Sequence, residues 1–467
     1  MLTVVLPYTV MQKVECATDE EAGFKFNKNH CYSLLKNLIQ VHNLNKDVVP
    51  DGYVMLCSEH LQKISHEYRF YLSWMESKDI IQIDYSYQIK SKCRYYKLIT
   101  DDVTNINYGR DVLMTVTFES NSSLTSSVTN VQNIFGISFL VDWLNQITID
   151  DQLANDLNWS VYQQDKVKPR VGYKEGMFGL EPYHIIPLRA YNFRKDNVKS
   201  INKGRIYATR DTTSGRLHTS LTGLSSKIFP ALRFKGKHLV GYDIANSQPF
   251  LTSVIINSLL ISYQLRQNEL KKEPLPSNHS LNPLITNTKL NNYLYKYTHT
   301  HPPYHTIMLE DFLSDADFTG VLEFQLLCKK GHLYPVMSQN IFGLEYVNDN
   351  KRVVKDLFFT LFFTKPKNNK KGIPKFKKQY PGVHKIISAI KDSSEEGNYF
   401  PVLLQSLESY YILEVVCKSI NKRYKNIPLF TKHDSIYTTE EYLPIIKSTL
   451  EEEALNLFGL VPSLNLT

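Results

Sequence analysis

The sequence of 467 residues has few cysteines and no long apolar segment. Its six cysteines lack the short paired spacings of zinc ligands or of a disulfide framework, so we expect a reducing compartment. The N-terminus has neither a basic start nor a long apolar core, which predicts no secretory signal peptide. No run reaches the roughly 18 apolar residues of a membrane span, so we expect a cytoplasmic protein without a membrane partner.

The remaining composition is that of a globular protein. The hydrophobic content of 42% is ordinary, which excludes a disordered chain, and the length favours two or three domains. The net charge of +8 suits a polyanionic partner such as nucleic acid but does not establish one.

Residues 1–105 predict a small N-terminal α/β domain. Apolar periodicity predicts helices at 30–40 and 58–74, and two alternating segments predict a hairpin with Lys90, Lys92 and Arg94 in its turn. Two helices followed by a basic hairpin resemble a winged helix, whose wing can contact phosphates. A scaffold domain with a solvated hairpin explains the same pattern.

Residues 106–200 predict a linker followed by a helical, thumb-like region. Ser, Thr and Asn dominate residues 101–135, which is typical of a linker. The apolar pattern at 134–153 then predicts a helix.

Two acidic residues, nearly two hundred positions apart, follow apolar segments that predict strands. The run at 239–242 ends at Asp243, and residues 427–439 have the pattern strand, Asp434, strand. Carboxylates on adjacent strands can hold two divalent ions about 3.5–4 Å apart, the arrangement that phosphoryl displacement uses. For each aspartate alone, a turn residue or a helix cap is the simpler interpretation.

A helix is predicted at residues 351–363, with cations at one end and rings at the other. Four side chains at steps of four residues share one face: Lys351, Lys355, Phe359 and Phe363. The cations can bind a triphosphate and the rings can stack on its base, although a phenylalanine core stripe with solvated lysines gives the same pattern. The lysine-rich segment 365–378 predicts a flexible loop suited to backbone phosphates.

These segments together resemble family A DNA polymerases over about residues 200–467. The resemblance rests on a Gly-Arg-Leu segment at 215–217, the strand that ends at Asp243, the helix at 351–363, a Tyr-Pro-x-Val element at 380–383 and a Lys-His-Asp segment at 432–434. It implies an α+β fold, a right-hand polymerase with an antiparallel palm sheet and helical fingers. The palm and fingers would occupy 201–467, with an insertion at 256–315 and the fingers at about 316–395.

The resemblance also implies site residues and cofactors. Asp243 and Asp434 would be catalytic and would hold two Mg²⁺ ions. The nucleotide-binding residues would be Lys351, Arg352, Lys355, Phe359, Phe363, Gln248 and Tyr334. The nucleic-acid-binding residues would be Arg205, Arg216, His218, Gln405 and His433, of which the two arginines and His218 are also basic or hydrogen-bonding side chains in a hydroxyl-rich segment.

Some positions depart from the family pattern. Gln248 stands where the family carries a glutamate beside the sugar 2′ position, Phe363 replaces a tyrosine, and Thr364 replaces a glycine. Tyr334 takes the place of a histidine. Ser435 stands where the DNA enzymes have a glutamate and matches phage-type single-subunit RNA polymerases.

The implied activity is extension of a primer 3′ hydroxyl with dNTPs on a DNA template, by a monomeric enzyme that uses two-metal catalysis. The first 190 residues lack the spaced carboxylates of an editing exonuclease, so none is expected. Gln248 and Ser435, together with residues 204–208 and Thr360, keep open a single-subunit RNA polymerase or a polymerase of mixed sugar choice as the alternative. Thr364 and the insertion keep open a non-catalytic nucleic-acid-binding replication or mobile-element protein on a decayed polymerase fold.

Overall fold

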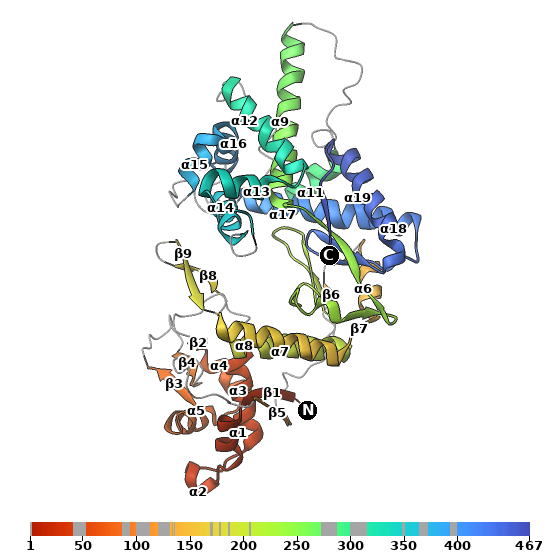
Figure 1. Cartoon of the computed structure of the whole chain (residues 1–467). Coiled ribbons are helices and arrows are strands. Elements are labelled where there is room, and N and C mark those ends of the chain that lie inside the picture. Colours follow the sequence, from red (N-terminus) through yellow and green to blue (C-terminus); the bar gives the residue numbers. More distant parts are fainter. Residues whose placement is uncertain are drawn as a thin grey trace. The chain divides into compact units, whose positions relative to one another are not determined.

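The protein has an α+β architecture that forms two compact units (Figure 1). Unit 1 comprises Met1–Val128, Ile149–Arg205 and Leu224–Ala231, and unit 2 comprises Thr129–Thr148, Ile206–Gly223 and Leu232–Thr467. The three consecutive domains expected from the sequence stay a prediction. The computed structural model describes residues 2–40, 53–85, 94–99, 113–119, 131–132, 134, 136–168, 171–176, 179–184, 187–204, 207–271, 287–298, 315–347, 351–363, 372–392 and 399–467.

Unit 1 begins with helices around two small sheets. The helices are α1 (Tyr8–Glu15), α2 (Asp19–Ala22), α3 (Lys28–Gln40), α4 (Ser58–Ile64) and α5 (Tyr68–Ser77). The strands are β1 (Leu2–Pro7), β2 (Val54–Leu56), β3 (Ile81–Asp84), β4 (Arg94–Leu98) and β5 (Leu113–Phe118), paired antiparallel in the orders β1-β5 and β2-β4-β3. The apolar stripe of α3 lies in the core, which confirms the helix predicted there.

The single helix predicted at 58–74 is wrong. Ser65 is extended, with φ −153° and ψ 130°, and separates α4 from α5. Its hydroxyl accepts a hydrogen bond from the Glu67 N–H (3.3 Å), a local bond that competes with the helical pattern. The predicted hairpin is confirmed, because β3 and β4 pair with Ile83 opposite Tyr96. Lys90 and Lys92 of its turn lie outside the described residues.

The helix predicted at 134–153 is also wrong. This stretch contains α6 (Phe139–Leu144) and β7 (Ile147–Ile149), and α7 (Asp151–Val167) follows. In β7 the two isoleucines are buried and the threonine between them is exposed, a period of two that fits a strand. Asp150 caps α7 by accepting a hydrogen bond from the Leu153 N–H (3.1 Å).

Unit 1 also contains a helix pair, a hairpin and the short 3₁₀ helix η5 (Phe229–Ala231). The hairpin is formed by β8 (Val171–Gly176) and β9 (Gly179–His184), and α8 (Pro187–Asn202) follows it. A buried asparagine joins α7 to α8, because the Asn158 amide donates to the Tyr191 carbonyl (3.0 Å). Asn192 of α8 then bonds both backbone groups of Val5 in β1. The thumb-like role expected of this region stays a prediction.

Unit 2 is organised around a four-stranded antiparallel sheet. Its strands are β14 (Val240–Ile244), β15 (Phe430–Lys432), β16 (Ser435–Thr438) and β17 (Leu464–Leu466), in the order β15-β16-β14-β17. Both predicted strand segments are confirmed, and β14 continues through Asp243 to Ile244. A Cβ atom on Gly241 would lie 2.4 Å from the Ile436 carbonyl oxygen, so this strand pair requires glycine at that position.

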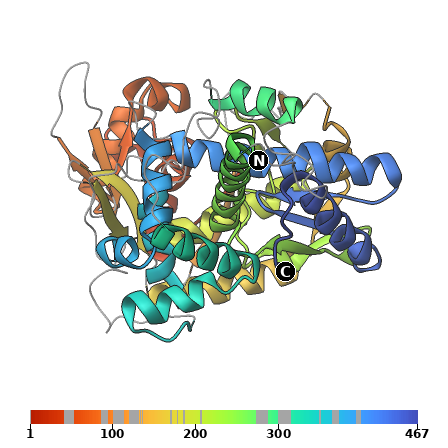
Figure 2. The ribbon, with the colours of Figure 1, turned by 90° about the horizontal axis from the view of Figure 1, so that it is seen from above.

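Unit 2 also contains a set of helices, of which α19 packs on β14. They are α9 (Ser247–Lys271), α11 (Thr288–Thr298), α12 (Asp315–Lys329), α13 (Leu333–Met337) with the π-helical η8 (Ser338–Phe342), α14 (Lys351–Phe363), α15 (Ile373–Gln379), α16 (Pro381–Asp392), α17 (Tyr399–Ser409) with the π-helical η9 (Tyr410–Cys417) and α18 (Lys418–Arg423), and α19 (Leu443–Phe458). Helices α12 and α17 pack on α9, which is the green helix at the centre of Figure 2. Smaller elements of unit 2 are β6 (Val131–Gln132), β10 (Ala208–Arg210), β11 (Leu217–Thr219), β12 (Leu232–Phe234), β13 (Lys237–His238) and η10 (Glu440–Tyr442).

The segments 351–363 and 365–378 were predicted to be a helix and a loop, respectively. The helix at 351–363 is confirmed as α14. The loop predicted at 365–378 is wrong in its second half, because α15 starts at Ile373 with Pro374 in its first turn, where proline is tolerated. Residues 364–371 lie outside the described part of the chain, as does much of the predicted insertion. Within the described residues, we find no helix that combines the length and the apolar character needed to cross a bilayer.

Candidate active site

Asp243 and Asp434 lie together at one edge of the four-stranded sheet. In the ladder between β14 and β16, Asp243 is opposite Ser435, and Asp434 precedes that serine in the turn after β15. The turn forces His433 into the left-handed region, at φ +55°. Both carboxyl groups line one cavity, and the charge of Asp243 raises the pKa of Asp434, so the juxtaposition expected from the sequence is present.

The electrostatics of the pair favour a bound cation. Burial raises the pKa of Asp243, against the opposing effect of hydrogen bonds from Ser435, Asp434 and Asn465. Burial raises the pKa of Asp434 well above its usual range, and the charges of Glu408 and Asp243 raise it further. A divalent cation would relieve this repulsion, because carboxylate oxygens are ligands that Mg²⁺ accepts.

The donor set fits an ion that keeps further ligands from water or substrate. No group of three or more His, Cys, Asp or Glu side chains in the described parts of the chain is arranged to hold a metal. Mg²⁺ is usually bound through one or two carboxylates together with waters and substrate phosphates. The two aspartates are therefore the residues that could hold it.

Two polar neighbours hold Asp243 in place. The Ser435 hydroxyl donates a hydrogen bond to Asp243 Oδ1 (3.1 Å). Asn465 of β17 is paired opposite Asp243 on the other side of β14, and its side chain helps to lower the pKa of that carboxyl group. Sequence reasoning missed Asn465, because a three-residue segment of alternating Leu and Asn carries no motif that would link it to β14.

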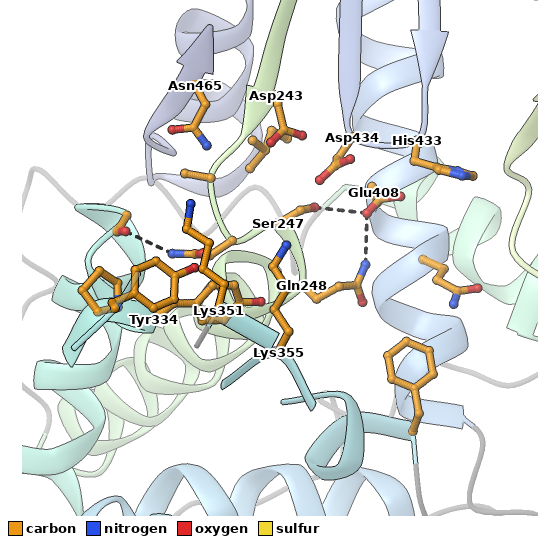
Figure 3. A pocket seen from close by; sticks show the side chains of 18 of the residues that line it. Asp243, Ser247, Gln248, Tyr334, Lys351, Lys355, Glu408, His433, Asp434 and Asn465 are labelled. Atoms are coloured by element: carbon orange, nitrogen blue, oxygen red, sulfur yellow. Dashed lines mark hydrogen bonds between the residues drawn. The ribbon is translucent and has the colours of Figure 1, made fainter. Parts of the chain in front are cut away.

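The two aspartates line a cavity of about 700 Å³ (Figure 3). Many of the residues predicted from the sequence line it: Asp243, Asp434, Gln248, Tyr334, Lys351, Lys355, Phe363, Arg216, Gln405 and His433. Of the others, Arg352, Phe359 and His218 are not among the lining residues. Arg205 lies outside the described residues.

Helix α14 presents two lysines and one ring to this cavity. Lys355 lies close enough to Asp243 for its charge to lower the pKa of that carboxyl group. Lys351 Nζ lies 5.7 Å from the centroid of the Tyr346 ring, a cation–π contact. At the other end, Phe359 stacks on Phe363 with ring centroids 4.7 Å apart and an interplanar angle of 8°. Phe359 is 43% exposed, so its ring backs Phe363 instead of lining the cavity.

A buried carboxylate that the sequence reasoning did not assign lies on the opposite wall. Glu408 of α17 is 2% exposed and accepts a hydrogen bond from Arg216 (2.6 Å). It also accepts from the hydroxyl of Ser247 (3.1 Å) and from the amide of Gln248 (3.0 Å). Its spacing of one turn from Gln405 is the signal that could have found it.

The histidines beside the cavity differ in their partners. His218 Nε2 lies 3.1 Å from Asp211 Oδ2. Although burial raises the pKa of Asp211, hydrogen bonds from His218 and from Ser214 and Thr213 lower it below its usual range. Burial and the nearby charges of Arg216 and His218 lower the pKa of His433 to about 4, so its ring is neutral at neutral pH.

The chain matches no protein-family model, and no curated protein sequence matches it.

Proposed function

We propose that unit 2 is the palm and fingers of a right-hand polymerase that transfers nucleotides to a primer under the direction of a template. The palm would be the sheet β15-β16-β14-β17, and the fingers would include α14. The single observation that carries the proposal is the pair of Asp243 and Asp434, whose charges interact, in a cavity that α14 also lines with Lys351 and Lys355. Two carboxylates facing cations suit a nucleoside triphosphate together with divalent metal.

Each group of residues that lines the cavity would bind a different part of the substrates. Asp243 and Asp434 would hold Mg²⁺, which when bound lowers the pKa of the primer 3′ hydroxyl and neutralises phosphate charge. Lys351 and Lys355 would bind the triphosphate as point charges. Phe363 would stack on the base of the incoming nucleotide. The acceptor and donor would be a DNA template-primer and dNTPs, handled by a monomer without editing activity.

Primer extension with purified protein, Mg²⁺ and dNTPs tests this proposal. Asp243→Asn and Asp434→Asn should each reduce extension at least a hundredfold while template-primer binding persists. Asp142→Asn is the matched control, because Asp142 is an exposed aspartate of α6 that does not line the cavity. Full extension by either active-site variant, or no extension by the wild-type protein with any nucleotide, contradicts the proposal and favours a non-catalytic nucleic-acid-binding protein.

A single-subunit RNA polymerase is the second candidate. The observation that favours it is the hydrogen bond from the Ser435 hydroxyl to Asp243, which gives this serine a direct role at the position where DNA enzymes resembling this chain carry a glutamate. Extension with rNTPs in place of dNTPs, on the same template-primer, distinguishes the two activities.

A further inference from the structure

Helix α11 lies in the segment that the sequence predicts as an insertion, but it is packed into unit 2. It contacts α17 (Figure 1), and its buried residues Leu290, Leu294 and Tyr297 recur every three or four positions. One face of this helix is therefore part of the core. The neighbours of that face indicate what this part of the expected insertion supports.

Two tyrosines of α11 enclose the guanidinium of Arg210, which is 6% exposed. The Arg210 Cζ atom lies 5.4 Å from the centroid of the Tyr293 ring and 5.6 Å from that of Tyr297. One guanidinium nitrogen donates to the Tyr293 hydroxyl (2.8 Å), and another forms an ion pair with Glu414 (2.6 Å). A buried cation needs partners that replace its water, so α11 and Arg210 hold each other in place.

The Tyr293 hydroxyl also reaches the turn at residues 211–216. It donates to the Gly215 carbonyl (3.4 Å) and lies 3.0 Å from Ser409 Oγ of α17, whose hydroxyl donates to the Ser214 carbonyl (2.7 Å). Gly215 has φ +70°, and a Cβ atom there would collide with the Tyr293 hydroxyl. The tyrosine and α17 thus hold the same turn together.

This turn ends at Arg216, which lines the cavity of the two aspartates. The Arg216 N–H donates to Asp211 Oδ2 (3.1 Å) within the turn. Its guanidinium pairs with Glu408 through a terminal nitrogen (2.6 Å), and its buried Nε has no hydrogen-bond partner among the described residues. The position of the guanidinium in the cavity therefore depends on the backbone of the turn that Tyr293 holds.

We propose that Tyr293 is a positioning residue, which holds the turn at 211–216 so that the Arg216 guanidinium occupies the cavity beside the aspartates. The inference rests on the proposed function and gives part of the expected insertion a role in it. If α11 only covered α17, its apolar residues would suffice, and the Tyr293 hydroxyl could be lost without effect on the reaction.

Single-nucleotide addition measures the effect of each part of the tyrosine. Tyr293→Phe removes only the hydroxyl and should lower kcat/KM about three- to tenfold, the effect of one hydrogen bond. Tyr293→Leu also removes the ring beside Arg210 and should lower kcat/KM further. Tyr295→Phe is the matched control, because Tyr295 lies on the same helix, is 49% exposed and does not line the cavity. Rates are compared well below the lowest melting temperature, so that every variant is folded.

A double-mutant cycle with Arg216→Lys distinguishes positioning from a general effect on stability. Arg216→Lys keeps a charge opposite the buried Glu408 but loses the guanidinium, so it should itself lower kcat/KM about three- to tenfold. In this background Tyr293→Phe should cause a further loss of less than about twofold, because the group that it positions is gone. The effects of independent sites would instead multiply to within about twofold.

Amide hydrogen exchange gives a readout that does not depend on turnover. The N–H groups of Thr213, Ser214 and Arg216 all donate to the Asp211 carboxylate within the turn. If α11 holds this turn closed, these amides should exchange faster in Tyr293→Leu than in the wild-type protein and should be unchanged in Tyr295→Leu.

The outcomes separate the inference from the proposed function. If wild-type protein neither binds template-primer nor incorporates any nucleotide, the proposed function fails and this inference fails with it. If wild-type protein extends the primer but Tyr293→Phe does so equally well, or the losses in Tyr293→Phe and Arg216→Lys multiply, the inference alone is overturned. Full activity of Arg216→Lys also overturns it, because the position of the guanidinium would then not matter. So does unchanged amide exchange in Tyr293→Leu, because α11 would then not hold the turn.

Discussion

Replacing Gly241 by alanine should disturb the two strands that carry the aspartates. The added Cβ would lie 2.4 Å from the Ile436 carbonyl oxygen and 2.9 Å from the Tyr437 Cα, both backbone atoms that cannot turn aside. Overpacking of this kind costs about 1–3 kcal/mol, and contact with backbone places this case near 3 kcal/mol. For a unit of this size, that corresponds to a fall in melting temperature of about 6–12 °C.

The control uses the same substitution with the opposite expectation. Gly320 lies in α12, where an added Cβ would be 3.5 Å from its nearest neighbour, an ordinary contact. Gly320→Ala should therefore stabilise the protein by up to about 1 kcal/mol through helix propensity. Calorimetry measures both variants, and primer extension should fall in Gly241→Ala alone. Equal melting temperatures for Gly241→Ala and wild type would refute the register in which Gly241 lies opposite Tyr437.

Three further predictions concern charged side chains of unit 2. Arg216→Met leaves Glu408 buried without its cation and should cost about 3–5 kcal/mol in urea unfolding, whereas Arg423→Met removes an exposed ion pair and should change little; equal effects would contradict the burial of the first pair. Burial lowers the pKa of Lys391 to about 8, so the unfolded chain binds more protons between about pH 8 and 10.4 and stability should rise with pH there. Melting temperatures measured over a pH series should rise in the wild-type protein and lack that rise in Lys391→Met. An identical rise in both proteins would argue against Lys391 as its cause. Lys355→Met should raise KM for the nucleotide about tenfold with little change in template-primer affinity, measured by single-turnover kinetics and filter binding; an unchanged KM would remove this lysine from the triphosphate site.

The parts of the fold that the sequence predicted are those with strong local periodicity. The helix at 30–40 has a repeating apolar pattern, the strand before Asp243 is an apolar run, and the helix at 351–363 has side chains at steps of four; each element is present. The failures lie where one residue or a few residues override the pattern. The Ser65 hydroxyl ends one helix by bonding nearby backbone, and three residues at Ile147–Ile149 change the period from helix to strand.

The candidate site was predictable only where its residues lie within recognisable segments. Asp243, Asp434 and Lys355 belong to such segments, and the structure places all three around one cavity. Asn465 and Glu408 reach the site through pairing of β17 with β14 and through packing of α17 on α9. Such long-range contacts depend on topology, which one sequence does not reveal. Glu408 lies one turn from Gln405, but that spacing alone does not distinguish it from a solvated helix residue.

The position of Glu408 also accounts for the serine opposite Asp243. Asp434 already experiences the charges of Asp243 and Glu408, both of which raise its pKa, whereas the charge of Arg216 lowers it. A further carboxylate at position 435, which is 6% exposed, would add repulsion that the one arginine cannot balance, and a hydroxyl there donates to Asp243 instead. Ser435→Glu should therefore abolish primer extension in the wild-type background and be less harmful together with Glu408→Gln.

A double-mutant cycle measures this dependence between Ser435 and Glu408. With repulsion through a buried site, the coupling between Ser435→Glu and Glu408→Gln should reach about 1–3 kcal/mol in unfolding free energy. Ser435→Ala is the control, because it removes the hydrogen bond to Asp243 without adding charge and should show little coupling to Glu408→Gln. Additive effects of Ser435→Glu and Glu408→Gln would mean that the two positions do not share one electrostatic environment, since charges this close in a buried site must affect each other.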